Sequence, residues 1–245
     1  MNILFYAVLF LLGVFVGKFY KLAIYRLPRN MDVLKKHYFG DMNEENNSKV
    51  LEILYSIFIG AIFILIAYIL KLDVYSLSVS SIIRYFITIL YFSTLIIIAG
   101  IDKENIKIEK KVLSFGTIVA LIYMIYMCVI NSAVIYKYAI YLMIHIILMT
   151  LDMFLLKKRA KDSYTIDTLI LLNIMLMCWD VRILFYTVWI TILTILIDLI
   201  ILKIRQKKSG NKQIKLSEVP IGFFLCVSNM VAIGIQIIIS NYILK

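Results

Sequence analysis

The stretch Ile98–Val112, IAGIDKENIKIEKKV, decides how this chain folds. An apolar run ends here, Asp102 follows it, and four lysines lie between positions 103 and 111. Lysines gather at the polar edge of a membrane, where their apolar stems stay in hydrocarbon and their ammonium groups reach water. The stretch therefore predicts the end of a membrane-spanning helix, with an acidic side chain at that edge.

The composition extends this prediction to the whole chain. Hydrophobic residues make up 63% of its 245 residues and charged residues 17%, and its mean hydropathy is +0.95. A soluble domain has about 45–50% apolar residues, and about 20 apolar residues in a helix cross a bilayer. We therefore expect an all-α, polytopic membrane bundle of about eight transmembrane helices, at approximately residues 3–26, 50–70, 81–101, 112–132, 136–156, 164–180, 183–203 and 219–243.

The net charge of +11 follows the predicted topology. With the N-terminus outside, 21 of the 26 Lys and Arg residues flank the inner ends of the expected helices, and the other five flank the outer ends. This asymmetry is the positive-inside rule, which predicts that the basic side is cytoplasmic. The charge thus indicates a lipid bilayer as partner, and no nucleic acid is expected.

The cysteine and histidine patterns predict no metal site. Cys128, Cys178 and Cys226 lie in or beside apolar runs and form no CxxC pair, so neither a zinc knuckle nor a disulfide framework is indicated. His37 lies in the polar stretch 30–49 and is typical of a surface histidine.

A second aspartate, Asp167, lies at a similar edge further along the chain. Asp102 ends a helix that runs from outside to inside, and Asp167 begins one that runs back, so both lie at about the same depth. If the two helices are neighbours, their carboxyl groups share a proton and titrate as a coupled pair. The ionised partner can then deprotonate water while the protonated one polarises a carbonyl. This pattern is compatible with hydrolysis that needs no metal.

Helix dipoles suggest which partner is ionised. Asp102 lies near a helix C-terminus, where an anion is disfavoured, and Asp167 lies near an N-terminus, where it is favoured. Our hypothesis is that Asp167 is the ionised base and that Asp102 carries the shared proton.

Two other interpretations of the residues stay open. Asp102 and Asp167 can be unconnected interfacial side chains, each solvated or paired with a nearby lysine. The polar stripes formed by His145 with Asp152, and by threonines with Asp198, can instead belong to a small proton-coupled transporter. Such stripes more often serve helix–helix packing.

Four blocks of sequence resemble, in order, those of the type IV prepilin peptidases, leader peptidases of the bacterial inner membrane. They are GKFYKLAIYRLPR at Gly17–Arg29, Asp102 with Ile108 six residues later, Asp167, and VPIGFF at Val219–Phe224. The resemblance implies that Asp102 and Asp167 are catalytic. It implies supporting or substrate-binding roles for Gly17, Arg26, Pro28, Gly100, Ile108, Pro220 and Gly222. It also implies an N-terminal membrane region, residues 1–80 with a cytoplasmic loop at 27–49, and a catalytic membrane region at 81–245.

The resemblance implies a reaction as well. Prepilin peptidases cut the leader peptide of prepilin-like proteins at the cytoplasmic face, just before a hydrophobic helix, and serve type IV pilus assembly or protein secretion. Some members also methylate the new N-terminus with S-adenosylmethionine. We therefore expect a prepilin or pseudopilin substrate, no cofactor for proteolysis, and S-adenosylmethionine if methylation is retained.

The chain departs from the family pattern around Asp167. The family's second motif is glycine, any residue, glycine and aspartate, with a lysine two residues later; the positions of these glycines and lysine hold Tyr164, Ile166 and Leu169. Glu109 replaces the proline that usually follows Ile108, and loop 30–49 lacks the cysteine tetrad of many members, so zinc is not expected. Because glycine lets backbone approach a substrate closely, a degenerate relative that binds pilin-like helices without cutting them is an alternative.

Overall fold

The structure is a computed structural model that describes residues 2–31, 49–72, 78–156, 163–209 and 219–242. Within these ranges every long element is a helix and no residue is in a strand, which confirms the all-α prediction. The helices are α1 (Asn2–Arg26), α2 (Lys49–Ile69), α3 (Val79–Asn105), α4 (Lys110–Ile130), α5 (Ile135–Leu156), α6 (Ser163–Cys178), α7 (Val181–Ser209) and α8 (Ile221–Tyr242). Single 3-10 turns, Leu27–Arg29 and Ser132–Val134, follow α1 and precede α5.

Most of these helices have the length and apolarity of membrane spans. Five segments are long and apolar enough to cross a membrane: Ile3–Arg29, Val79–Asn105, Lys110–Ile130, Ser132–Phe154 and Val181–Ile204. Three shorter apolar segments, Ile53–Ile69, Tyr164–Cys178 and Ile221–Gln236, coincide with the other expected spans. Large apolar side chains such as Ile125, Val129 and Ile140 are exposed, as they are where lipid surrounds a bundle. The helices are compatible with a multi-pass membrane protein. That all eight helices span the membrane stays a prediction.

Packing divides the chain into two compact units, Met1–Ser93 and Thr94–Lys245. The sequence-based division was expected between residues 80 and 81, close to the start of α3. The observed boundary lies inside α3, so the last turns of this helix, including Asp102, belong to the second unit.

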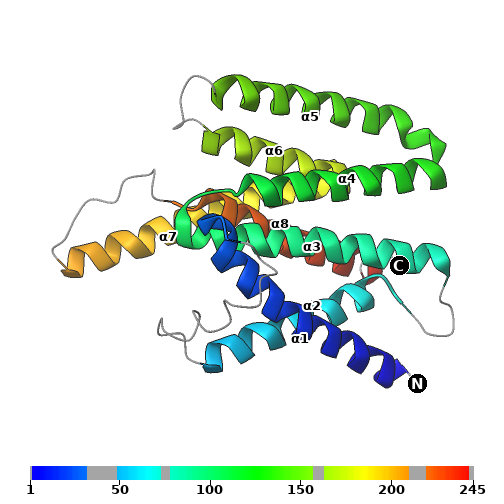
Figure 1. Ribbon diagram of the computed structural model, residues 1–245, viewed down its shortest axis with the longest axis horizontal. Coiled ribbons are helices and arrows are strands. Elements are labelled where there is room, and N and C mark those ends of the chain that lie inside the picture. Colours follow the sequence, from blue (N-terminus) through cyan, green and yellow to red (C-terminus); the bar gives the residue numbers. More distant parts are fainter. Residues whose placement is uncertain (1, 32–48, 73–77, 157–162, 210–218, 243–245) are drawn as a thin grey trace. The chain divides into compact units, whose positions relative to one another are not determined.

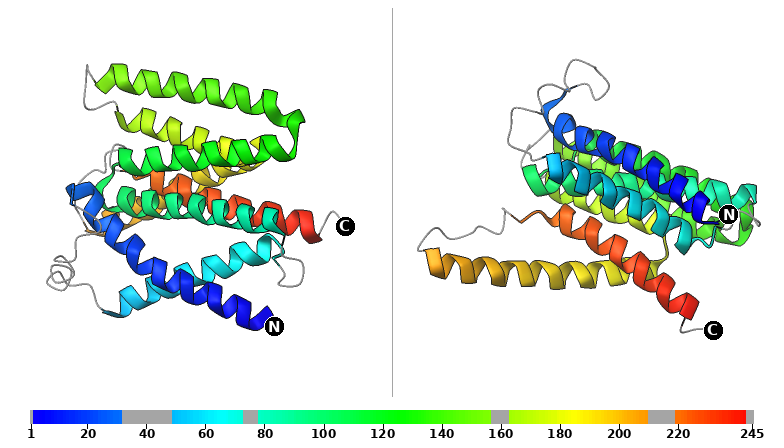
Figure 2. Two further views of the ribbon diagram at one scale, coloured as in Figure 1. Left: turned by 45° about the vertical axis from the view of Figure 1, so that its right-hand side comes forward. Right: turned by 90° about the horizontal axis from the view of Figure 1, so that it is seen from below.

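In the first unit α1 and α2 cross through a contact between small residues (Figure 2). A Cβ atom on Gly13 would lie 2.7 Å from the Cα of Gly60, and one on Gly17 would lie 2.9 Å from the Cα of Ser56. Small residues four positions apart let membrane helices approach each other closely. Gly17, for which the sequence predicted a supporting role, is therefore part of this helix contact.

In the second unit α6 lies between α4 and α5, and α7 pairs with α8 (Figure 1). The buried residues of α6 are mostly apolar, among them Ile170, Leu171 and Ile174. Asn229 on α8 donates a hydrogen bond of 2.9 Å to the Oγ1 atom of Thr187 on α7. The polar stripes of these two helices therefore serve packing at this point, as such stripes commonly do.

Candidate functional site

Asp102 lies on the last turn of α3, immediately before the chain turns into α4. The Ile106 N–H donates to the Asp102 carbonyl oxygen at 2.8 Å, and Ile106 itself has a φ of 50°. This left-handed conformation ends the helix, although a β-branched residue rarely adopts it. The turn leads directly to Ile108 and Glu109, both buried, and then to Lys110 at the start of α4.

The Asp102 side chain is fully buried, with 0% exposure, and accepts two hydrogen bonds on a single oxygen. The Tyr164 hydroxyl of α6 donates to its Oδ2 atom at 3.0 Å, and the Phe223 N–H of α8 donates to the same atom at 2.8 Å. Oδ1 is buried and has no hydrogen-bond partner among the residues that the structure describes. One oxygen of Asp102 is thus held by protein donors and the other is left for a further partner.

The start of α8 approaches Asp102 closely because residue 222 is a glycine. A Cβ atom on Gly222 would lie 3.0 Å from Asp102 Oδ2 and 3.3 Å from the Cδ1 atom of Ile108. The Gly222 N–H donates to the Tyr164 hydroxyl at 3.1 Å. Three of the predicted site residues, Asp102, Ile108 and Gly222, therefore meet here.

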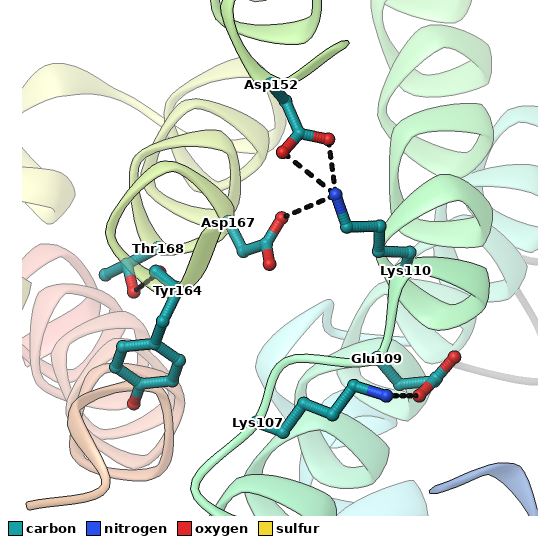
Figure 3. A network of polar contacts seen from close by, with 7 residues as sticks. All are labelled: Lys107, Glu109, Lys110, Asp152, Tyr164, Asp167 and Thr168. Atoms are coloured by element: carbon teal, nitrogen blue, oxygen red, sulfur yellow. Dashed lines mark hydrogen bonds and ion pairs between the residues drawn. The ribbon is translucent and has the colours of Figure 1, made fainter. Parts of the chain in front are cut away.

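Asp167 has a different set of partners (Figure 3). Lys110 of α4 lies 3.8 Å from Asp167 Oδ1 and donates to both carboxyl oxygens of Asp152 on α5, at 2.6 and 2.9 Å. In Figure 3 the two carboxyl groups point toward the Lys110 ammonium, whereas the Tyr164 side chain leaves α6 in another direction. Asp152 and Asp167 are both buried, and the shared ammonium offsets part of the cost of burying their negative charges. We call Lys110, Asp152 and Asp167 the charged cluster.

The two aspartates therefore share one end of the second unit but not one environment. Both reach α6: Asp102 contacts Tyr164, and Asp167 lies three residues further along the same helix. Asp167 lies near an ammonium and near the α6 N-terminus, and both favour its anion. The α3 C-terminus disfavours an Asp102 anion, as predicted, but the α8 N-terminus donates to it and favours the anion. Helix dipoles alone therefore do not assign the proton to Asp102.

A second polar group lies further along the same three helices. His145 on α5 is buried; its Nε2 atom lies 3.2 Å from Thr117 Oγ1 of α4, and its Nδ1 atom 3.1 Å from the Asn173 amide nitrogen of α6. Asn173 donates to Nδ1, so the neutral ring with its proton on Nε2 satisfies both contacts. The Thr117 hydroxyl in turn donates to the Leu113 carbonyl oxygen at 3.1 Å. We call Thr117, His145 and Asn173 the neutral cluster.

The remaining predicted site residues lie elsewhere. Gly17, Arg26 and Pro28 belong to the first unit: Gly17 packs against α2, Arg26 is buried at the end of α1, and Pro28 lies in the following 3-10 turn. In the second unit Gly100 lies half a turn before Asp102, and Pro220 directly precedes α8. The predicted loop 27–49 lies outside the described residues from position 32 to position 48.

Sequence reasoning missed Tyr164 and Lys110 as functional candidates. Tyr164 was noted only as the residue that replaces a motif glycine, and Lys110 only as one of several basic residues at a helix start. The pair of Lys110 with Asp152 joins residues 42 positions apart, so no local pattern indicates it.

Among the described residues, no three His, Cys, Asp or Glu side chains lie close enough together to hold a metal ion. Comparison of the chain with protein-family models, with curated proteins and with solved structures finds no match. The prepilin peptidase resemblance therefore stays a prediction, and the geometry of Asp102, Asp167 and their neighbours is the basis for proposing a function.

Proposed function

We propose that this protein is a membrane-embedded aspartyl endopeptidase that cuts the leader peptide of type IV prepilin-like proteins. The observation that carries the proposal is that two buried aspartates of one packed unit are both tied to the first turns of α6: Asp102 accepts a hydrogen bond from Tyr164, and Asp167 lies three residues after Tyr164. They come from helices α3 and α6 and lie far apart in sequence. Burying two carboxyl groups is costly unless something offsets it, and catalysis is a common reason for such an arrangement.

In the proposed reaction Asp167 is the base. Its carboxylate takes a proton from water, and the resulting hydroxide adds to the scissile carbonyl carbon. Asp102 gives a proton from Oδ1 to the carbonyl oxygen, and the tetrahedral gem-diol forms with no covalent link to the enzyme. Collapse of the gem-diol breaks the C–N bond, and the proton held by Asp167 passes to the leaving amine while Asp102 regains its own proton.

The environments of the two carboxyl groups suit these roles. The Lys110 ammonium near Asp167 stabilises a carboxylate. Asp102 has no ammonium among its hydrogen-bond partners in the described residues; it accepts two hydrogen bonds on Oδ2, which leaves Oδ1 as the oxygen that can hold a proton and pass it to a substrate carbonyl. These differences support one base and one acid, the division of labour that hydrolysis by two carboxyl groups requires.

The cellular setting is part of the proposal. Basic loops on the same side as Asp102 and Asp167 support a site at the cytoplasmic face of a bacterial inner membrane. The substrate would then be a prepilin or pseudopilin whose short leader ends where its hydrophobic helix begins. S-adenosylmethionine would be needed only if the new N-terminus is also methylated, which adds 14 Da to the product, a shift that mass spectrometry resolves.

The test uses the full-length protein in bilayer vesicles with a peptide that carries a leader followed by an apolar helix. We expect cleavage at a single bond, and a loss of about 1,000-fold or more in each of Asp102→Asn and Asp167→Asn, because each removes one proton-transfer group. Asp198→Asn, a half-buried aspartate of α7, is the matched control and should cleave normally.

The other results are equally clear. Unchanged cleavage in both Asn variants would remove the aspartates from the mechanism. Saturable binding of the peptide by the wild-type protein without cleavage would identify a degenerate binding protein in place of a peptidase. Proton flux through the vesicle membrane that depends on His145 and Asp198 would favour the transporter.

A further inference from the structure

The residue at position 164 is a tyrosine that joins three helices through its hydroxyl group. Tyr164 Oη accepts the Gly222 N–H at 3.1 Å and donates to Asp102 Oδ2 at 3.0 Å. The Phe223 N–H donates to the same Oδ2 at 2.8 Å. The first N–H groups of a helix have no acceptor within the helix. At the start of α8, the Tyr164 hydroxyl accepts from the Gly222 N–H and Asp102 accepts from the Phe223 N–H.

The direction of these bonds is fixed by the donors. Gly222 and Phe223 contribute backbone N–H groups, which can only donate. The single proton of the Tyr164 hydroxyl is then free to go to Asp102. A proton on Asp102 Oδ2 would compete with two donors that already point at this oxygen, whereas Oδ1 has no hydrogen-bond partner among the described residues.

We infer that Tyr164 is a positioning residue that fixes the Asp102 carboxyl group so that Oδ1, and not Oδ2, carries and transfers the proton. The inference rests on the proposed function for the transfer step, while the orientation of Asp102 does not depend on it. Tyr164 does not touch the reacting atoms in this assignment. It acts through Asp102. The glycine that the resembling family has at this position has no hydroxyl group and could not make this hydrogen bond.

The close approach of α8 supports the assignment independently. A Cβ at position 222 would lie 3.0 Å from Asp102 Oδ2 and 3.2 Å from its carboxyl carbon, so the carboxyl group is confined between α8 and Tyr164. The other titratable group that faces Asp102 from α8 is Cys226, one turn into the helix and fully buried. Lys103 on α3 has its ammonium 5.4 Å from the centre of the Phe223 ring, on the same helix start.

The first measurement follows Asp102 directly and needs no substrate. The infrared carbonyl stretch of a protonated carboxyl group can be assigned to Asp102 as the band lost in Asp102→Asn. In Tyr164→Phe the carboxylate loses one donor, and a hydrogen bond to a charged group is strong enough to move its titration upward by about one to two pH units. The frequency should also change, because Oδ2 accepts one bond fewer.

The second measurement is the pH dependence of cleavage. We expect Tyr164→Phe to lower kcat about tenfold with little change in KM, and to move the limb of the pH–rate profile in the same direction as the infrared titration. A residue that only supports the fold would lower the amount of active protein and leave both pH midpoints in place. Tyr138→Phe, which removes the hydroxyl of a buried tyrosine on α5, is the control.

A site-specific 3,5-difluorotyrosine at position 164 covers the case in which Tyr164→Phe does not fold. Its hydroxyl is more acidic and donates more strongly, so the Asp102 band should titrate at lower pH, opposite to the effect of phenylalanine. An unchanged Asp102 band and pH profile in either folded variant would overturn the inference. An infrared shift in a protein whose wild type does not cleave would support Tyr164 as the positioning residue and reject the peptidase function.

Discussion

The charged cluster and the neutral cluster are built on the same three helices and differ in whether their side chains carry formal charge. In the charged cluster one ammonium, on Lys110, serves two buried carboxyl groups (Figure 3). In the neutral cluster a ring, an amide and a hydroxyl connect with no formal charge. Each step from one cluster to the other is about two helical turns along α4, α5 and α6.

This difference indicates that the charged cluster belongs to a candidate site and that the neutral cluster serves helix packing. Polar groups inside a membrane protein are costly, and hydrogen bonds between neutral partners offset most of that cost. His145 has both ring nitrogens paired as a neutral ring, so it needs no proton from elsewhere. In the charged cluster the Lys110 ammonium is bonded to Asp152 and lies 3.8 Å from Asp167, so formal charges meet at buried carboxyl groups. Buried charged groups of this kind are common at functional sites. Of the residues on which the transporter interpretation relied, His145 is thus paired as a neutral ring, and that interpretation stays an untested alternative through Asp152 and Asp198.

The largest effect is expected from Lys110→Met, which leaves Asp152 and Asp167 without their shared ammonium. The two carboxyl groups are buried while the Lys110 side chain is 39% exposed, so the cost should lie above the roughly 1 kcal/mol of an exposed pair and below that of a fully buried one. We therefore expect a clear loss of thermal stability in detergent together with a loss of cleavage. Asp152→Asn in the Lys110→Met background should recover much of the stability, because one of the two carboxyl groups that lost the ammonium no longer carries a charge. Equal stability of Lys110→Met and the wild type would show that this cluster is solvated in the membrane protein.

Gly222→Ala tests the surroundings of Asp102 and should lower activity more than it lowers stability. The added methyl group would meet Asp102 Oδ2 at 3.0 Å and Ile108 at 3.3 Å, so α8 must shift by a few tenths of an ångström. We expect a cost of about 1–3 kcal/mol in stability and a loss of cleavage greater than that of folded protein. Gly234→Ala on the same helix is the matched control, since its Cβ would meet nothing within 4 Å. Equal effects of the two alanines would contradict the close approach of α8.

The neutral cluster predicts a different outcome for His145→Leu. Hydrogen bonds between membrane helices average about 0.6 kcal/mol, with a maximum near 1.7, so losing the contacts with Thr117 and Asn173 should cost about 1–2 kcal/mol. The pH–rate profile of cleavage should keep its shape, because the ring is neutral and paired in the wild type. A shifted pH–rate profile would indicate that the two clusters exchange protons, and it would favour the transporter interpretation.

The helices and the edge positions of Asp102 and Asp167 could be predicted because apolar run length and flanking charge are local properties of the sequence. Each of the eight described long helices overlaps an expected span. Asp102, Ile108 and Gly222 were each named as site residues from the resemblance to a family, but their contact with one another was not predicted. The boundary between the two units, inside α3 at Ser93, has no sequence signal, since the helix continues through it.

The partners of the aspartates could not be predicted, because they depend on which faces of several helices meet. Lys110 is one of four lysines near Asp102 in sequence, and nothing local distinguishes it as the partner of Asp152 and Asp167. At position 164 the missing glycine was the visible feature. The contribution of the tyrosine hydroxyl depends on the approach of α8, which is a tertiary property.

The smallest effect is expected at an exposed counterpart of the charged cluster, the pair of Lys137 with Asp180. Its atoms lie 3.2 Å apart, but the Asp180 side chain is 59% exposed, against 11% for Asp152 with Lys110. Partial burial alone would raise the pKa of Asp180, but the Lys137 ammonium and the Val181 N–H outweigh it and lower the pKa below its ordinary value of 3.8. The pair therefore contributes stability that is complete above about pH 4 and is lost as the pH falls through the lowered pKa.

A double-mutant cycle with Lys137→Met and Asp180→Asn should give a coupling below about 1 kcal/mol, because solvent screens exposed pairs. The same cycle with Lys110→Met and Asp152→Asn should give a coupling several times larger, since that carboxyl group is buried. Both pairs join Lys and Asp across a similar sequence distance, so burial is the main variable between them. Two equal couplings would mean that the charged cluster is as accessible to water as the exposed pair, and that burial does not distinguish the candidate site.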